Sequence, residues 1–423
     1  MNILMMTNTY VPHVGGVARS VAAFTKEYRR LGHRVVVVAP EYEEDPNDEK
    51  DTIRVPAIQH FNGSDFSAMI PIPGFLEAHL QNFQPEIVHS HHPFLMGSTA
   101  VRVAMKHGAP LVYTQHTLFE QYTHYVPIHL ARMKPFVVSL CTGYANIAEQ
   151  VIAPSDSIAR ILKERGVKKP IETIATGIFI DEFERGNGQA IRGSENIPRE
   201  AFVVGHVGRL ASEKNLDFLS EAVAKFLQNE PEAHFLIVGY GPSEKKMKDL
   251  FTQRGLQNRV HFPGKKNGQE LIDAYHAMNV FAFSSKSETQ GLVLTEAMAA
   301  GVPAVALDAS GVRDVVQDQT NGYLLHDEQV DTFAGALKKM CQLPNPSKQH
   351  FITEAKRTAE SYSMNNCASK ILSVYQRLLE SHIADPHKDE SVWHKSIEHI
   401  KAEWELFSNL TTAVEEALIE SKN

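Results

Sequence analysis

Residues 283–303 read FSSKSETQGLVLTEAMAAGVP, which passes from a buried strand through a polar loop into an apolar helix. The helix is expected to stop at Gly301, because glycine just past a helix end and a nearby proline, here Pro303, are the usual stop signals. Glu288 lies in the loop before the helix, and Glu296 lies inside it. The free N–H groups of a helix start attract phosphate, and a neighbouring carboxylate accepts hydrogen bonds from hydroxyl groups. This stretch therefore favours a ligand with both phosphate and sugar hydroxyls, such as a nucleotide sugar.

The same alternation of strand and helix extends in both directions along the chain. In the N-terminal half, strands are expected at residues 2–6, 35–39, 53–55, 87–93, 111–114, 151–155 and 171–174. Helices between them are expected at residues 17–31, 75–82, 101–107, 137–151 and 156–165. In the C-terminal half, strands are expected at residues 202–208, 234–238, 260–262, 280–283, 302–307 and 322–325. Regular alternation of this kind predicts α/β domains with parallel sheets.

A stretch rich in glycine, asparagine and glutamate precedes the strand at 202–208 and divides the chain. The length of 423 residues also favours two or three domains. We expect an N-terminal α/β domain, a linker, a second α/β domain, a further helix and an amphipathic helical tail. Their expected bounds are residues 1–183, 184–199, 200–361, 362–382 and 383–423, in that order.

The composition is that of an ordinary globular protein in a reducing compartment. Hydrophobic residues make up 43% of the chain and charged residues 22%, which allows a large core. The three cysteines, Cys141, Cys341 and Cys367, have no CxxC spacing, which argues against a disulfide framework or a zinc site. The net charge of -8 gives no general footprint for nucleic acid, so no nucleic-acid partner is expected.

No segment of the sequence predicts passage through a membrane. Residues 1–6 lack the basic region and the apolar length of a signal peptide. No stretch approaches the roughly 20 apolar residues that span a bilayer. We expect a cytoplasmic protein, at most bound to the inner membrane face. The apolar loop IPIPG at residues 70–74 has two interpretations, contact with lipid or a partner and burial against the core.

Two glycines stand where the first long helix begins. The segment PHVGGVARS at residues 12–20 places Gly15 and Gly16 there, and glycine lets the backbone approach a ligand closely. The segment lacks the GxGxxG pattern, so a NAD site is not supported. A simple tight turn is the alternative interpretation.

Four histidines lie at the ends of two predicted strands that succeed one another along the chain. His89, His91 and His92 end the strand that starts at residue 87, and His116 follows the strand at 111–114. A metal site would need acidic or cysteine ligands that are not nearby, so hydrogen bonding is the favoured role for the first three. Ligands of open α/β sheets bind at the carboxyl ends of strands, which makes His116 the better site candidate. A supporting or core role for His116 remains the alternative.

Arg209 and Lys214 flank the turn after the strand at 202–208. Two cations beside a helix start can clamp a diphosphate. An ordinary solvated, charged turn is the alternative interpretation of this fragment.

Five motifs in this order resemble the retaining glycosyltransferases of family 4, which have the GT-B fold. The motifs are PHVGGVARS, the strand-end His116, GRLASEKN at 208–215, GYGP at 239–242 and the pair Glu288-x7-Glu296. The resemblance covers about residues 2–380. It implies two Rossmann-like domains whose parallel sheets face one another across a cleft, and a helix at 362–382 that crosses back to the first domain.

The resemblance also implies a role for each matching residue. Of the catalytic residues, Arg209 and Lys214 would hold the diphosphate and the growing charge of the leaving group, Glu288 would bind sugar hydroxyls, and His116 would lie against the donor sugar. The backbones of Gly16, Gln290, Gly291 and Leu292 would approach the donor, and Glu296 would hold the ribose. The implied donor-binding residues are Gly15, Gly16, Gly264, Lys265, Gln290, Gly291, Leu292 and Glu296, with Gly264 and Lys265 near the base.

The implied reaction needs no cofactor beyond its nucleotide-sugar donor. Cations and oriented N–H groups stabilise the departing diphosphate, so a metal is not required. No carboxylate nucleophile emerges in the first half of the chain. This agrees with the front-face mechanism proposed for the family, in which the departing phosphate helps to deprotonate the acceptor.

The acceptor is indicated by two further segments. HSHHPFLMGSTA at 89–100 and HTLFEQYTHYVP at 116–127 are similar to the diacylglycerol glucosyltransferases of the family. That similarity implies UDP-glucose as donor, a lipid acceptor and peripheral membrane contact. The alternatives are a soluble sugar or glycan acceptor, a GDP-mannose-dependent mannosyltransferase and, from another class, a non-catalytic nucleotide-sugar-binding protein.

The tail carries an apolar stripe with alternating spacings of four and three. Its members are Trp393, Ile397, Ile400, Trp404, Phe407, Thr411, Val414 and Leu418. Such a stripe predicts an amphipathic helix or a short coiled coil. Packing onto the body of the protein is the favoured interpretation, a homodimer through the tail is the second, and membrane contact is the third.

Overall fold

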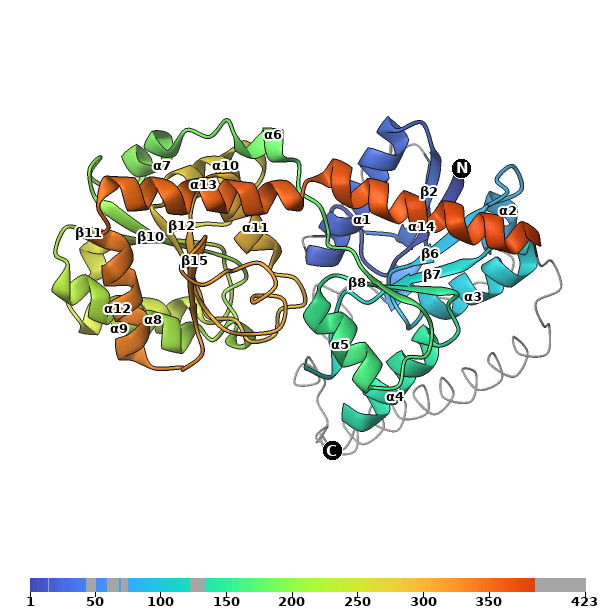
Figure 1. Ribbon diagram of the computed structural model, residues 1–423, viewed down its shortest axis with the longest axis horizontal. Helices are drawn as coiled ribbons and strands as arrows, with labels where there is room; N and C mark the ends of the chain where they lie inside the picture. The colour runs from blue at the N-terminus through green and yellow to red at the C-terminus, as the bar shows by residue number, and fades with distance from the viewer. Residues whose placement is uncertain (14, 43–50, 59–67, 70–74, 122–133, 385–423) are drawn as a thin grey trace. The chain divides into compact units, whose positions relative to one another are not determined.

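The computed structural model describes residues 1–13, 15–42, 51–58, 68–69, 75–121 and 134–384 (Figure 1). The chain forms two compact units. Of the described residues, the first unit contains those within 1–154, 158–174 and 368–384, and the second contains 155–157 and 175–367. The IPIPG loop at 70–74 and the apolar stripe at 393–418 lie outside the described residues, as does part of the segment 116–127.

A seven-stranded sheet forms the centre of the first unit. Its order is β3-β2-β1-β6-β7-β8-β9, and all neighbours run parallel. The strands are β1 Asn2–Met6, β2 Arg34–Pro40, β3 Thr52–Val55, β6 Ile87–Ser90, β7 Leu111–Thr114, β8 Gln150–Ala153 and β9 Ile171–Thr173. Two short strands, β4 Ala57–Ile58 and β5 Ala68–Met69, pair antiparallel beside it. The strand order reverses between β1 and β6, where open α/β sheets place their ligands at the carboxyl ends.

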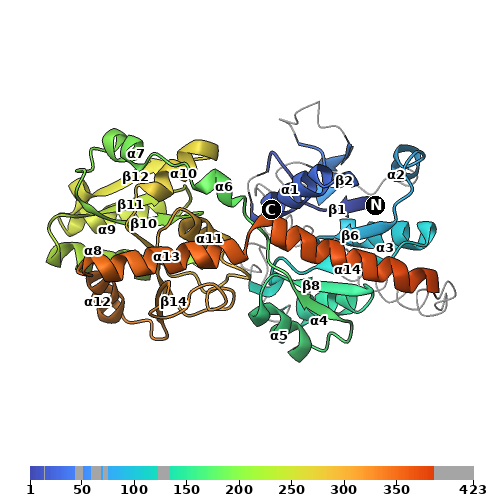
Figure 2. The same ribbon diagram turned by 45° about the horizontal axis from the view of Figure 1, so that its top comes forward.

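Helices cover both faces of this sheet (Figures 1 and 2). They are α1 Gly16–Arg30, α2 Phe75–His79, α3 Met96–His107, α4 Lys134–Ala145 and α5 Asp156–Glu164. In α1 the buried side chains of Val21, Phe24 and Tyr28 recur every three or four residues, so one face of the helix packs on the sheet. The helix α14, Met364–Ala384, begins in the second unit and continues in the first, where Tyr375 packs edge-on against Tyr28.

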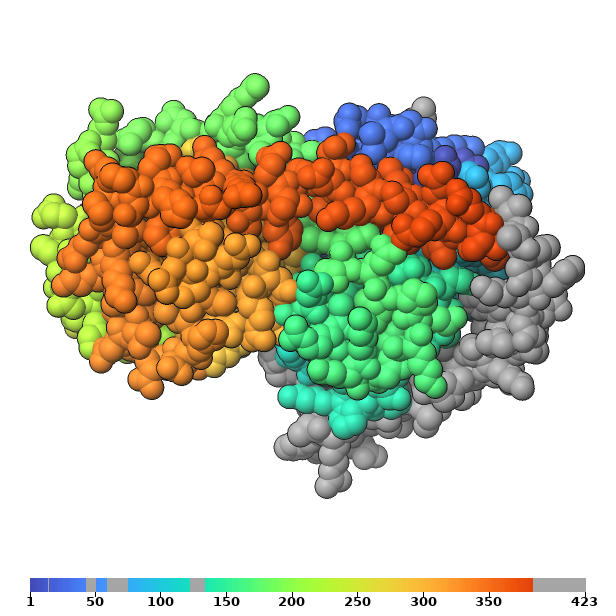
Figure 3. All heavy atoms as spheres, viewed as in Figure 1, coloured from blue at the N-terminus to red at the C-terminus, as the bar shows by residue number. Residues whose placement is uncertain are grey.

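A six-stranded parallel sheet forms the centre of the second unit, in the order β12-β11-β10-β13-β14-β15. The strands are β10 Phe202–Val207, β11 Ala233–Val238, β12 Val260–Gly264, β13 Val280–Phe283, β14 Ala304–Leu307 and β15 Gly322–Leu325. The helices of this unit are α6 Ile180–Phe183, α7 Gly188–Ser194, α8 Leu216–Asn229, α9 Glu244–Gln253, α10 Gly268–His276, α11 Leu292–Ala299, α12 Val330–Cys341 and α13 Asn345–Ser361. A short 3-10 turn, η5 Ser212–Lys214, precedes α8, and α13 lies on the surface of the unit in Figure 3. Separate apolar clusters fill the two faces of the sheet.

The predicted fold class is confirmed, since each unit is a Rossmann-like α/β domain with a parallel sheet. Three predicted helices are wrong in their extent. The helix expected at 75–82 ends at His79, and the helix expected at 101–107 already begins at Met96. The helix expected over residues 137–151 ends at Ala145, and Gln150–Ala153 is the strand β8. The strand expected at 151–155 is thus found, and it pairs with β7 on one side and with β9 on the other, so the helix must end before the turn that leads into it.

Residues 184–199, for which a linker is expected, contain α7 and pack into the second unit. Arg192 of this helix is only 6% exposed. Its guanidinium donates to the carbonyl oxygens of Ala277 at 3.0 Å, Arg199 at 2.7 Å and Ala201 at 2.9 Å. A buried cation requires such partners, and here they tie the segment to the fold. Among the described helices, none has both the length and the apolar character needed to cross a membrane.

Candidate functional site

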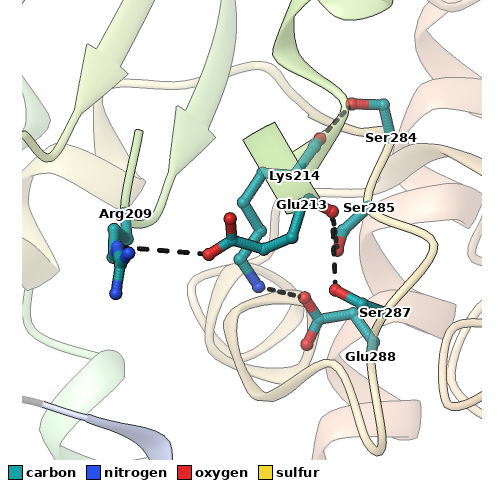
Figure 4. Close-up of polar contacts among 7 residues, drawn as sticks. All are labelled: Arg209, Glu213, Lys214, Ser284, Ser285, Ser287 and Glu288. Atoms are coloured by element: carbon teal, nitrogen blue, oxygen red, sulfur yellow. Dashed lines mark hydrogen bonds and ion pairs between the residues drawn. The ribbon is translucent and has the colours of Figure 1, made fainter. Parts of the chain in front are cut away.

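An ion pair between Lys214 and Glu288 forms the centre of the candidate site in the second unit (Figure 4). The Lys214 Nζ atom lies 2.5 Å from a carboxylate oxygen of Glu288. The two side chains are only 19% and 16% exposed, so water screens the pair weakly. Burial alone would raise the pKa of Glu288, but the Lys214 ammonium and hydrogen bonds from Lys214 and Ser285 hold that pKa below its ordinary value. Glu288 is therefore an anion held against a cation.

Serine hydroxyls fasten the loop that carries this glutamate to the turn that carries the lysine (Figure 4). Ser284 donates to the carbonyl oxygen of Lys214 at 2.9 Å. Ser285 and Ser287 reach the carbonyl oxygen of Glu213 at 3.5 and 3.4 Å. Carbonyls in a turn have no strand partner, and short hydroxyl side chains can satisfy them. The serine-rich character of the loop thus positions its carboxylate against η5.

Arg209 lies five residues before Lys214, and Gly208 separates it from the end of β10. Its Nε atom is 4.0 Å from a carboxylate oxygen of Glu213, and its side chain is 54% exposed. The side chain of Glu213 is only 7% exposed. Sequence reasoning missed Glu213, although the spacing of four from Arg209 was visible. The turn therefore holds two cations, each next to a carboxylate.

A second residue that sequence reasoning missed is His206, near the end of β10. Its ring is fully buried and stacks on Phe281 and Phe283, at centroid distances of 6.2 and 6.3 Å. Its Nδ1 atom lies 3.1 Å from the carbonyl oxygen of Ala282. A carbonyl only accepts, so Nδ1 carries the proton, and Nε2 is a bare acceptor without a partner among the described residues. Burial lowers the pKa of His206 to about 4, against the opposing effect of the Ala282 hydrogen bond, which keeps the ring neutral.

The helix α11 begins next to this pair of charges. Gly291 stands at its N-cap with φ +76, a conformation that favours glycine. Gln290 is buried, and its amide exchanges two hydrogen bonds with the backbone of Thr176, at 2.7 and 2.8 Å. The Gln290 side chain therefore fixes the loop, and the backbone at Gly291 and Leu292 forms the helix start that was predicted to approach a donor.

The three remaining candidates of the second unit are Glu296 inside α11 and Gly264 and Lys265 at the end of β12. Glu296 is fully buried in α11 and accepts a hydrogen bond from the Tyr275 hydroxyl at 2.7 Å. Gly264 ends β12 with φ +76, and Lys265 after it is exposed. β12 is the edge strand, separated from β10 by β11, so these two residues lie two strands away from Arg209.

In the first unit, Gly15 and Gly16 stand at the start of α1, after β1. Gly15 is extended, with φ -166 and ψ 160, and Gly16 is the first residue of the helix. A methyl group added at Gly16 would meet no atom within 4 Å. The fold of this unit therefore does not itself require glycine at position 16.

His89 and His92 have roles in holding the first unit together. The two ring nitrogens of His89 lie 2.5 Å from the Tyr375 hydroxyl and 2.7 Å from the Thr114 hydroxyl. The Asn8 backbone N–H donates to Nδ1 of His92 at 3.1 Å. Among the described residues, no group of three or more histidine, cysteine, aspartate or glutamate side chains is arranged to hold a metal ion.

His91 and His116 instead contact one another. Nδ1 of His91 lies 2.9 Å from Nε2 of His116. Burial lowers the pKa of His116 to about 3, and burial together with the neighbouring histidines holds the pKa of His91 well below its ordinary value. Both rings are therefore neutral. His91 is 2% exposed, whereas His116 is partly open to solvent.

The structure thus brings part of the predicted site together in the second unit, and in the first unit it places two predicted residues after the carboxyl ends of strands. In the second unit, Lys214 and Glu288 are in contact, and Glu288 lies three residues before the N-cap of α11. In the first unit, Gly16 and His116 follow the carboxyl ends of β1 and β7.

Family models match both halves of the chain. Residues 14–182 match the model described as Glycosyltransferase Family 4. Residues 187–358 match the model described as Glycosyl transferases group 1.

Individual proteins are similar over most of the chain. The alpha-monoglucosyldiacylglycerol synthase of Streptococcus pneumoniae is 28% identical over 363 residues, which cover 84% of this chain and 81% of that protein. The GDP-mannose-dependent alpha-mannosyltransferase of Mycobacterium tuberculosis is 28% identical over 331 residues, 77% of this chain and 84% of that one. The crystal structure of Anabaena HepE in complex with UDP and glucose shares the fold, with a TM-score of 0.71 and 19% identity over 89% of this chain and 100% of that chain.

Proposed function

The chain belongs to glycosyltransferase family 4, and we propose that it transfers a hexose from a nucleotide-sugar donor to a hydroxyl acceptor with retention of configuration. The observation that carries this proposal is the Lys214–Glu288 pair, fastened by serines in front of the α11 start. A cation and a helix start suit a diphosphate, and a carboxylate suits the hydroxyls of a sugar.

The charges fit the demands of the reaction. As the bond between sugar and diphosphate breaks, negative charge grows on the leaving oxygen. Lys214 and Arg209 would stabilise that charge, because preorganised cations act most strongly where it develops. Glu288 would then exchange part of its contact with Lys214 for hydrogen bonds from sugar hydroxyls.

A two-carboxylate hydrolase is less well supported by the same residues. A retaining hydrolase needs an acid and a nucleophile flanking the bond. Glu288 is paired with Lys214, and Glu296 is buried against Tyr275, so each carboxylate has another partner. We therefore propose a front-face mechanism, in which the departing phosphate helps to deprotonate the acceptor.

For the substrates, we propose UDP-glucose as donor and a membrane lipid such as diacylglycerol as acceptor, reached by peripheral contact with the membrane. The name of the Streptococcus pneumoniae relative supports a glucosylated lipid product, and the HepE complex supports UDP. The mannosyltransferase relative supports GDP-mannose as the alternative donor.

A donor screen with Glu288→Ala tests the enzymatic function. UDP-glucose and GDP-mannose are each incubated with diacylglycerol vesicles and with soluble glycans, and nucleoside diphosphate release and product mass are measured. We expect one donor to give product with the wild type. Glu288→Ala should lower kcat/KM by about 10²-fold or more, since a positioned polar contact to the reacting sugar is lost. Donor binding without turnover in every pair would identify a nucleotide-sugar-binding protein instead.

Gly16→Ala tests the contact between the α1 start and the donor. The added methyl group meets nothing within 4 Å in the protein, so the free energy of unfolding should stay the same or rise slightly. If the backbone at Gly16 approaches the donor phosphates, the methyl group displaces the donor, and kcat/KM should fall by about 10²-fold. Gly335→Ala is the matched control, because Gly335 lies inside α12 and a methyl group there also meets nothing within 4 Å. Equal activity of the two variants would show that position 16 does not contact the donor.

A further inference from the structure

His91 is a buried polar side chain of the first unit whose burial is energetically unfavourable. It is 2% exposed, and its ring lies over that of His89 with a centroid distance of 4.2 Å. Its Nε2 atom has no hydrogen-bond partner among the described residues. A buried polar atom without a partner costs about 1–3 kcal/mol. An apolar side chain would avoid that cost, so the histidine must contribute through its other nitrogen, Nδ1.

In the contact between Nδ1 of His91 and Nε2 of His116, one nitrogen must donate a hydrogen and the other must accept it. Both rings are neutral, so one of the facing nitrogens carries a hydrogen and the other a lone pair. If Nδ1 of His91 donates, His116 must carry its proton on Nδ1. If Nε2 of His116 donates, His91 must carry its proton on its own partnerless Nε2. Buried N–H groups without an acceptor are rarer than under-satisfied acceptors, so the first arrangement is favoured.

We propose that His91 is a positioning residue that fixes the tautomer and the ring direction of His116, so that His116 meets an oxygen of the donor sugar as an Nδ1–H donor. The proposal rests on the proposed function for the sugar contact. His91 itself is buried and acts only through His116. A histidine whose second nitrogen is held in this way keeps one tautomer, as orienting partners do for other functional histidines.

Three substitutions separate positioning from packing. His91→Phe keeps a flat ring over His89 but removes the donor. His91→Asn places an amide N–H near the position of Nδ1 and so restores the donor without the ring. The matched control is His234→Phe in the second unit, where His234 and His261 form another histidine pair at 2.9 Å. His234 stands at the amino end of β11, opposite to the ligand-binding ends of the strands.

The first readout is kinetic. His91→Phe should lower kcat by about 10- to 100-fold, by analogy with the range found when the hydrogen-bond partner of a metal-ligating histidine is removed. The KM for the donor should change less than kcat, and His91→Asn should recover most of the loss. His234→Phe should keep wild-type kcat. Wild-type kcat in His91→Phe, or equal loss in His91→Phe and His91→Asn, would overturn the proposal.

The second readout does not depend on activity. In protein labelled with ¹⁵N-histidine, the ring nitrogens of His116 are identified by comparison with His116→Gln. We expect Nδ1 of His116 to carry the proton in the wild type and in His91→Asn, and a mixture of tautomers in His91→Phe. An unchanged His116 tautomer in His91→Phe would overturn the positioning role. If the wild type transferred no sugar, the proposed function would be contradicted. The tautomer of His116 could still be measured, and it would still decide whether His91 positions that ring.

Discussion

Replacing Lys214 by alanine is expected to lower kcat/KM for the donor by about 10³-fold. Two effects add. The substitution removes a cation from the place where leaving-group charge develops, which costs about 10²- to 10³-fold in other enzymes. It also removes the partner of Glu288, whose side chain is only 16% exposed in the wild type. Because burial raises the pKa of Glu288 and Lys214 opposes that rise, the glutamate should become easier to protonate.

The pH profile separates the two effects of Lys214→Ala. In the wild type the pKa of Glu288 is lowered, so the anion persists as the pH falls toward the ordinary range of a carboxyl group. In the variant the acid limb of kcat/KM should move to higher pH. Lys286→Ala is the control, since Lys286 lies in the same loop and pairs with Glu328 on the surface. We expect less than about a twofold change for that variant. Similar losses in the two variants would mean that Lys214 acts only through the general charge of the surface.

The sequence predicted much of the second unit because its signals are local. The strand, loop and helix over 283–303 and the stop at Gly301 follow from short-range patterns, and α11 is found there. The pairing of Lys214 with Glu288 could not be derived in this way, since 74 positions separate them. The tertiary fold brings η5 to the loop after β13, and the serines of that loop find their carbonyl partners only then.

The residues that sequence reasoning missed are buried and polar. His206 reads as an ordinary member of an apolar strand, and only the hydrogen bond from its Nδ1 atom to the carbonyl oxygen of Ala282 gives it a defined tautomer. His91 was seen beside His89 and His92, but its bond to His116 requires the neighbouring strands β6 and β7 in register. Hydrogen-bond partners of buried side chains depend on strand order, which a single sequence does not reveal.

We expect the same histidines to make the first unit sensitive to acid. Burial lowers the pKa of His89 and His92 to about 3, from an ordinary value of 6.5, and both side chains are at most 5% exposed. The residues that face them, His91, His116, His13 and Tyr375, provide no anion that would stabilise a charged ring. In the unfolded chain these histidines take up protons near pH 6.5, while in the folded chain they do so only near pH 3.

The sign of the effect follows from proton uptake. Between about pH 6.5 and pH 3 the unfolded state binds more protons, so the free energy of unfolding falls as the pH falls. Above that window all the rings are neutral and add no pH dependence. At about pH 5, each of His89 and His92 should lower the free energy of unfolding by on the order of 2 kcal/mol, because one pKa unit corresponds to about 1.4 kcal/mol. His91 acts in the same direction.

Hydrogen exchange of the amides in β6 and β7, with urea unfolding followed by circular dichroism, measures this loss between about pH 7.5 and pH 5. His89→Gln is the informative variant, because an amide can still meet the Thr114 and Tyr375 hydroxyls but does not titrate. It should be less stable than the wild type at about pH 7.5, yet lose less stability on acidification, with a slope smaller by up to one proton. The free energy of unfolding of wild type and variant could fall with pH at the same slope, or not fall at all. Either result would show that protonation of the buried histidines does not cause the loss of stability in acid. A smaller slope in the variant would locate the acid sensitivity at the strand ends that also carry His116.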